Sequence, residues 1–148
     1  MVQSKTLAQL TSLVIGVAYA IGGIVGFAYT GFSGVTASNG PKVFGILSVN
    51  PFHNVFHLVV GLGLLYAAAK LSTTFNEGAL IGLGSIYIIA TICGFIYAHI
   101  PVISVVSSSA PDNYLHLITG LTALAGGTLS ASISKSPGGT TPASALGR

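Results

Sequence analysis

Four long apolar stretches dominate this sequence and decide what it can fold into. They cover about residues 7–30, 51–70, 78–100 and 111–133. Each is close to or above the roughly 20 mostly apolar residues that a helix needs to cross a hydrocarbon layer about 30 Å thick. Because backbone groups facing lipid must be hydrogen-bonded internally, we expect helices rather than open strands. The predicted fold class is an all-α integral membrane protein with four transmembrane helices.

The composition excludes the main soluble classes. Of the 148 residues, 51% are hydrophobic and 5% are charged, whereas a soluble domain carries about 25% charged residues. The high apolar content excludes a disordered chain. Five Lys and Arg residues are too few for a nucleic-acid surface, so no nucleic-acid partner is expected. The single cysteine, Cys93, excludes an intrachain disulfide framework.

The charged residues near the span ends predict an orientation. One side of the membrane receives Lys5, Lys70, Glu77, Lys135 and Arg148, and the other receives Lys42 and Asp112. Because basic residues are enriched in cytoplasmic loops, both termini are predicted to be cytoplasmic in a bacterial inner (plasma) membrane, or stromal in a thylakoid membrane. Residues 1–134 form the predicted transmembrane domain. Residues 135–148, rich in Pro, Gly, Ser and Thr, are predicted to be a disordered tail.

The second half of the chain repeats the first. Over the first and third stretches, Gly16, Tyr19, Ile21, Ile24, Gly26, Phe27 and Tyr29 align with Gly84, Tyr87, Ile89, Ile92, Gly94, Phe95 and Tyr97. Over the second and fourth, Asn54, His57, Leu58, Gly61, Leu62 and Leu65 align with Asn113, His116, Leu117, Gly120, Leu121 and Leu124. The predicted repeats are about 7–72 and 76–134. A repeated two-span unit keeps its orientation, so we expect two tandem helical hairpins around a pseudo-twofold axis along the membrane normal.

Two histidines lie at matched positions of this repeat. His57 shares one helix face with Asn54, and His116 shares the matching face with Asn113. An ionisable side chain inside a span faces the bundle interior or a cavity, and it marks a functional site by default. Asn54, His57, Asn113 and His116 are therefore the predicted cofactor-binding residues.

A purely structural interpretation of these residues is an interhelical clasp. In it, His57 bonds Asn113 or a backbone carbonyl, and His116 mirrors this contact with Asn54. Such bonds contribute roughly 0.6–2 kcal/mol each in membranes. Tyr19 and Tyr87 also lie deep in their spans, so each needs a hydroxyl partner, which we expect across the repeat axis.

Two ligand-binding interpretations remain open beside the clasp. In the first, His57 and His116 are the axial ligands of a tetrapyrrole, either haem b or chlorophyll, because a neutral imidazole binds both central metals. In the second, His53 and His57 at i, i+4 combine with Asp112 and His116 at the same spacing. Three imidazoles and one carboxylate form a set suited to zinc, copper or iron.

Catalytic motifs are absent from the sequence. It contains no GxSxG, no HExxH, no phosphate-binding loop and no pair of carboxylates within a span. We therefore expect no catalytic residues and a protein that is not an enzyme. Before the second stretch, Lys42 and residues 43–49 are predicted to form a short interfacial segment that covers the histidines or meets a partner.

The residues around the two histidines resemble a known family. Residues 44–61 contain an Asn-x-x-His-Leu-x-x-Gly motif from Asn54 to Gly61, and the fourth stretch contains Asp-Asn-x-x-His-Leu from Asp112 to Leu117. Both are similar to motifs of a bacterial four-span membrane family that is labelled a domain of unknown function, number four thousand three hundred and eighty-three. The resemblance covers about residues 7–134, and it implies that Asn54, His57, Asn113 and His116 are the positions of interest. It implies no activity.

These observations favour a small non-enzymatic membrane protein. We expect an accessory subunit, or an assembly or stability factor, of a larger photosynthetic or respiratory complex. The expected partners are membrane lipids and other integral membrane subunits or a second copy of this chain. The alternative is a haem- or chlorophyll-binding protein that uses His57 and His116.

Overall fold

The computed structural model describes residues 4–37, 39–97, 100, 103 and 105–136. Four helices make up most of this part of the chain: α1 (Leu7–Thr30), α2 (Pro51–Lys70), α3 (Thr73–Ile96) and α4 (Pro111–Lys135). All four are long and apolar enough to cross a membrane. The predicted all-α fold class with four spans is therefore confirmed, and the chain is a multi-pass membrane protein. Residues 137–148 of the predicted tail lie outside the described residues.

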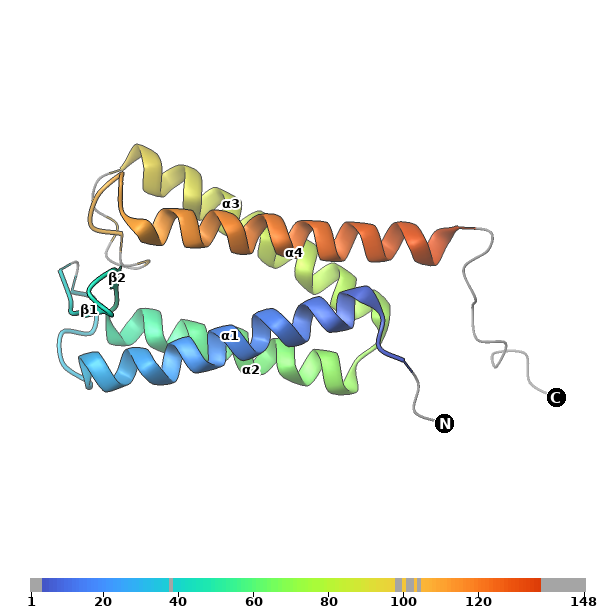
Figure 1. Ribbon diagram of the computed structural model, residues 1–148, viewed down its shortest axis with the longest axis horizontal. Coiled ribbons are helices and arrows are strands. Elements are labelled where there is room, and N and C mark those ends of the chain that lie inside the picture. The colour runs from blue at the N-terminus through green and yellow to red at the C-terminus, as the bar shows by residue number, and fades with distance from the viewer. Residues whose placement is uncertain (1–3, 38, 98–99, 101–102, 104, 137–148) are drawn as a thin grey trace.

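The helices are arranged as two antiparallel hairpins (Figure 1). α1 lies along α2, and α3 lies along α4, and most contacts between helices fall within these two pairs. The connections from α1 to α2 and from α3 to α4 lie at one end of the bundle, which we call the loop end. The start of α1 and the short α2–α3 turn lie at the opposite end, which we call the turn end.

A short β-hairpin lies at the loop end between α1 and α2. Strand β1 (Lys42–Val43) pairs with β2 (Leu47–Ser48) in antiparallel register. The predicted interfacial segment is thus a folded hairpin. Part of the bundle interior beside His53, His57 and His116 is a cavity, described below, and no residue of the β-hairpin lines it. Within the described residues, the hairpin therefore does not form the expected cover over the histidines.

The helix starts follow local capping signals. The Asn50 side chain accepts a hydrogen bond from the His53 amide at 2.8 Å, and Pro51 occupies the first helical position, as the sequence predicts. α3 begins at Thr73, before the predicted start near residue 78. The reason is the Ser72 hydroxyl, which caps this helix by accepting from the Phe75 amide at 3.2 Å.

Glu77 consequently lies inside α3 rather than in the connecting loop. Its side chain is only 7% exposed. The Ser130 and Ser134 hydroxyls of α4 donate hydrogen bonds to its Oε1 at 2.8 and 3.2 Å. Two hydroxyl donors compensate a carboxylate for lost water, so Glu77 joins α3 to α4 near the turn end instead of contributing to the surface charge.

Glycines let the helices of each hairpin approach closely. A Cβ added at Gly16 would lie 3.0 Å from the Gly61 carbonyl oxygen, and one added at Gly84 would lie 2.8 Å from the Gly120 carbonyl oxygen. Close backbone contact replaces the hydrophobic driving force that lipid does not supply. The same pair of aligned positions makes this contact in both hairpins. The tandem-repeat arrangement and its pseudo-twofold axis along the membrane normal stay predictions.

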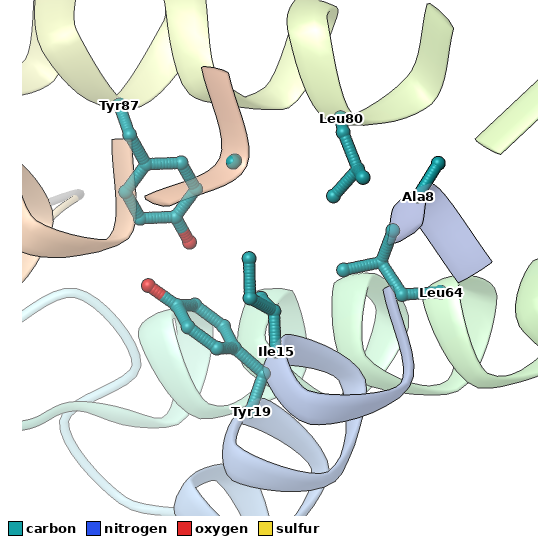
Figure 2. Packing of buried hydrophobic residues seen from close by; sticks show 7 residues of the cluster. Ala8, Ile15, Tyr19, Leu64, Leu80 and Tyr87 are labelled. Atoms are coloured by element: carbon teal, nitrogen blue, oxygen red, sulfur yellow. The ribbon is translucent and has the colours of Figure 1, made fainter. Parts of the chain in front are cut away.

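Two tyrosines fill the centre of the bundle (Figure 2). Tyr19 and Tyr87 meet edge to face, with ring centroids 5.6 Å apart and an interplanar angle of 87°. Figure 2 shows their hydroxyl groups turned toward each other. The Tyr19 hydroxyl donates to the Thr119 hydroxyl of α4 at 3.0 Å. This bond confirms the expected hydroxyl partner for Tyr19 in the other hairpin.

Candidate functional site

A cavity of about 170 Å³ lies between α2, α3 and α4 toward the loop end. We call it the histidine cavity. It is lined by Phe52, His53, Phe56, His57, Ile86, Tyr87, Ala90, Ile103 and His116. α2 supplies two of its imidazoles and α4 supplies the third, so the two hairpins build the site together.

The three imidazoles form one group. His53 Nε2 and His57 Nε2 share a hydrogen bond of 2.7 Å, in which one neutral ring donates and the other accepts. The His53 and His116 rings are nearly parallel, with centroids 5.9 Å apart and an interplanar angle of 19°. The i, i+4 spacing on α2 thus produces a ring pair, and α4 brings the third ring against it.

Burial makes His116 the most unusual member of this group. Its side chain is 3% exposed, and its Nδ1 is buried without a hydrogen-bond partner. No described residue forms a hydrogen bond with either of its ring nitrogens. An unsatisfied buried polar group costs about 1–3 kcal/mol. His116 is therefore a polar group held in place by packing alone.

Each histidine of the repeat packs against a tyrosine of its own hairpin. Tyr19 lies against His57 with ring centroids 4.6 Å apart, and Tyr87 lies against His116 at 5.4 Å. The sequence marks both tyrosines as deep in the membrane but does not place them at the site. Alignment of the two repeats is the signal that identifies them, because each tyrosine keeps the same relation to its histidine.

Asp112 does not join the imidazoles. Its Oδ2 accepts a hydrogen bond from the Ser48 backbone amide at 3.3 Å, which ties β2 to α4. Within the described residues, no group of three or more His, Cys, Asp or Glu side chains is placed to hold a metal ion. The predicted set of His53, His57, Asp112 and His116 is therefore not assembled as a metal site, since the carboxylate is committed to the β-hairpin.

The two asparagines also lie apart from the histidine cavity. Asn54 donates to the Thr30 hydroxyl at 2.9 Å, and Asn113 donates to the Ser108 carbonyl at 3.0 Å. The predicted clasp of His57 with Asn113 and of His116 with Asn54 is wrong, because each asparagine bonds within its own hairpin.

The side-chain oxygens of the asparagines occupy matched positions. Oδ1 of Asn54 fills the space where Gly26 would carry a Cβ, and Oδ1 of Asn113 fills the same space at Gly94. Both asparagines are fully buried. They hold α1 to α2 and α3 to α4, and neither reaches the cavity as a cofactor ligand.

A tetrapyrrole does not fit the site as the helices lie. His57 and His116 line the same cavity, as the predicted axial pair requires. Its volume of about 170 Å³ is below the roughly 300–1,000 Å³ of pockets that hold drug-sized ligands. The His57 Nε2 is also engaged by His53. A macrocycle would need α2 and α4 to separate.

Comparison with known proteins places the chain in one family. Residues 9–129 match the family described as Domain of unknown function (DUF4383). This match covers both histidine motifs and all of the repeat except its ends. Comparison with curated proteins and with solved structures gave no match. The chain is thus a member of the DUF4383 family, whose function is unknown.

Proposed function

We propose that this protein is a small non-enzymatic subunit, or an assembly factor, of a larger membrane complex of photosynthesis or respiration. The supporting observation is a group of exposed apolar side chains at the loop end, which we call the loop-end patch. It consists of Tyr29, Phe32, Val35, Phe44 and Ile46. Exposed apolar side chains gathered on loops beyond the spans are typical of a protein interface.

Phe44 is an exposed aromatic member of the loop-end patch with an uncommon backbone conformation. It lies between β1 and β2 with 75% of its surface exposed and a φ of 52°. This left-handed conformation costs an L-residue roughly 1–2 kcal/mol. Phe44 and Gly45 both have positive φ because they are the central residues of the turn that joins β1 to β2. The exposed aromatic ring at this turn, where Asn or Gly is usual, is what favours a partner.

The loop-end patch has a defined position on the bundle. The Phe44 ring meets the Tyr29 ring at the end of α1, with centroids 6.2 Å apart. The hydrogen bond from the Ser48 amide to Asp112 anchors the base of the β-hairpin on α4. We infer that the partner is an apolar surface of another integral membrane subunit. In the proposed orientation, with cytoplasmic or stromal termini, this contact lies on the opposite side of the inner or thylakoid membrane.

A glycine substitution tests this role without harming the fold. Phe44→Gly removes the aromatic ring and relieves the strain, because glycine adopts a positive φ at little cost. We expect this variant to be at least as heat-stable as wild type but to leave the large complex on a native gel after extraction from its own membrane. Phe44→Tyr keeps the ring and is expected to remain in the complex. Co-migration of both variants with a large complex would contradict the role of the patch.

The alternative function is binding of haem b or chlorophyll by His57 and His116. It is supported by the convergence of both rings on one cavity, and it requires that cavity to widen. An absorption spectrum of the protein purified in mild detergent tests it. The alternative expects a Soret or chlorophyll band that disappears in His57→Ala and His116→Ala, whereas the subunit role expects a colourless protein.

A further inference from the structure

The histidine cavity has one wall toward the membrane and one wall inside the bundle. Phe52, Phe56 and Ile86 are exposed on the outer surface of α2 and α3, whereas His116 and Tyr87 are almost fully buried. The cavity is partly open, and these exposed residues form its rim. Because that surface faces acyl chains when the helices span a bilayer, a ligand would enter from the lipid phase.

The volume of the cavity limits the size of the ligand. A dry apolar cavity of about 150 Å³ holds one benzene molecule, and the histidine cavity measures about 170 Å³. One six-membered ring with small substituents therefore fits. Fused ring systems and macrocycles do not fit unless the helices move.

The walls of the cavity suit a flat ring. The lining includes the nearly parallel rings of His53 and His116 and the ring of Tyr87, which meets His116 edge to face. Phe52 and Phe56 complete the lining on the side of the rim. Aromatic side chains favour stacked and edge-to-face contacts with a planar ligand.

Two imidazoles that line the cavity keep a buried Nδ1 without a hydrogen-bond partner, His53 and His116. A neutral imidazole offers one N–H donor and one lone pair. His53 and His57 use one such pair on each other, whereas the buried ring of His116 has no hydrogen bond to any described residue. Because Nδ1 of His116 has almost no accessible surface, a ligand carbonyl in the cavity would bond the Nε2–H and lower the cost of burying the ring.

We propose that the histidine cavity binds the ring of a membrane-soluble quinone, with a quinone carbonyl oxygen accepting a hydrogen bond from His116. The alkyl tail of the quinone leaves past Phe56 and Ile86 into the lipid. This proposal goes beyond the subunit role and does not depend on it, because the site is complete within one chain.

Titration with a decyl-benzoquinone tests the proposal on the full chain in detergent. The chain has six tyrosines and no tryptophan, and Tyr87 lines the cavity, so quenching of tyrosine fluorescence reports binding. We expect saturable quenching in wild type. His116→Phe keeps a flat ring but removes both nitrogens, and it should raise the Kd roughly tenfold, the loss of one hydrogen bond. Ala90→Leu fills the cavity and should abolish saturable binding.

Tyr114→Phe is the matched control, because Tyr114 lies on α4 close to His116 but is exposed on the outer surface. It should keep the wild-type Kd. Unchanged helical circular dichroism establishes that each variant is folded. A folded Ala90→Leu variant that still binds with the wild-type Kd overturns the proposal, as does quenching that never saturates in wild type. A tetrapyrrole band in the wild-type protein that is lost in His116→Phe also overturns it.

Discussion

The Tyr19 hydroxyl donates a hydrogen bond to the Thr119 hydroxyl at 3.0 Å, and this bond joins the two hairpins through α1 and α4. Tyr19→Phe removes the donor while keeping the ring against Tyr87 and His57. Hydrogen bonds between spans contribute about 0.6–1.7 kcal/mol. We therefore expect a loss of that size in the free energy of unfolding, measured in detergent with an added denaturing surfactant.

A double-mutant cycle with Thr119→Val isolates this bond. If the bond joins the hairpins, Tyr19→Phe should cost little once Thr119 is already Val, because the partner is gone. If the losses in the free energy of unfolding caused by the two substitutions simply add, the Tyr19 and Thr119 hydroxyls do not interact. That result would remove the main polar link between the hairpins.

Backbone contact between α1 and α2 predicts a different response at two glycines of one helix. A Cβ at Gly61 would overlap the Ala20 backbone, whereas one at Gly63 meets open space. Gly61→Ala should lower stability by about 1–3 kcal/mol through overpacking. Gly63→Ala should leave stability unchanged or raise it by up to about 1 kcal/mol. Equal thermal midpoints for both variants would show that the α1–α2 contact is not this close.

The repeat predicts equal effects at Gly26 and Gly94. Gly26→Ala displaces the Asn54 side chain, and Gly94→Ala displaces the Asn113 side chain. Each should lower the thermal midpoint by a similar amount, because each breaks the hydrogen bond of its asparagine. Gly82→Ala, which meets open space, is the control. A silent substitution at either Gly26 or Gly94 would argue against matched packing in the two hairpins.

Asp112 is expected to hold the β-hairpin on α4. Asp112→Ala removes the acceptor of the Ser48 amide, and a neutral hydrogen bond contributes about 0.5–1.5 kcal/mol. Hydrogen exchange of the Ser48 amide should therefore become up to roughly tenfold faster. Asp112→Asn keeps an acceptor oxygen and should retain most of the protection. Unchanged exchange in Asp112→Ala would show that the bond to Asp112 does not protect the amide.

The sequence predicts much of this fold because hydrophobic length and capping are local properties. The α1 and α2 ranges and the cap at Asn50 follow directly from it. The start of α3 does not, because a carboxylate at Glu77 argues against a span until its hydrogen-bond donors Ser130 and Ser134 on α4 are known. Pairings between distant helices cannot be obtained from one sequence.

The candidate site is likewise predictable from the sequence only in part. The i, i+4 spacing places His53 and His57 on one helix face, and the repeat singles out His116. The roles of Asn54 and Asn113 are not predictable in this way. A small polar side chain beside a histidine motif suggests a ligand, but the space left by Gly26 and Gly94 on a neighbouring helix directs both asparagines away from the cavity.

Native mass spectrometry of the protein released from its own membrane in mild detergent tests the central claim most directly. The chain alone has a mass of 14.9 kDa. The proposed role predicts a larger assembly that contains this chain together with other membrane subunits and that is lost in Phe44→Gly. Detection of the protein only at its own mass would contradict the proposed function, provided that other complexes from the same membranes survive the extraction.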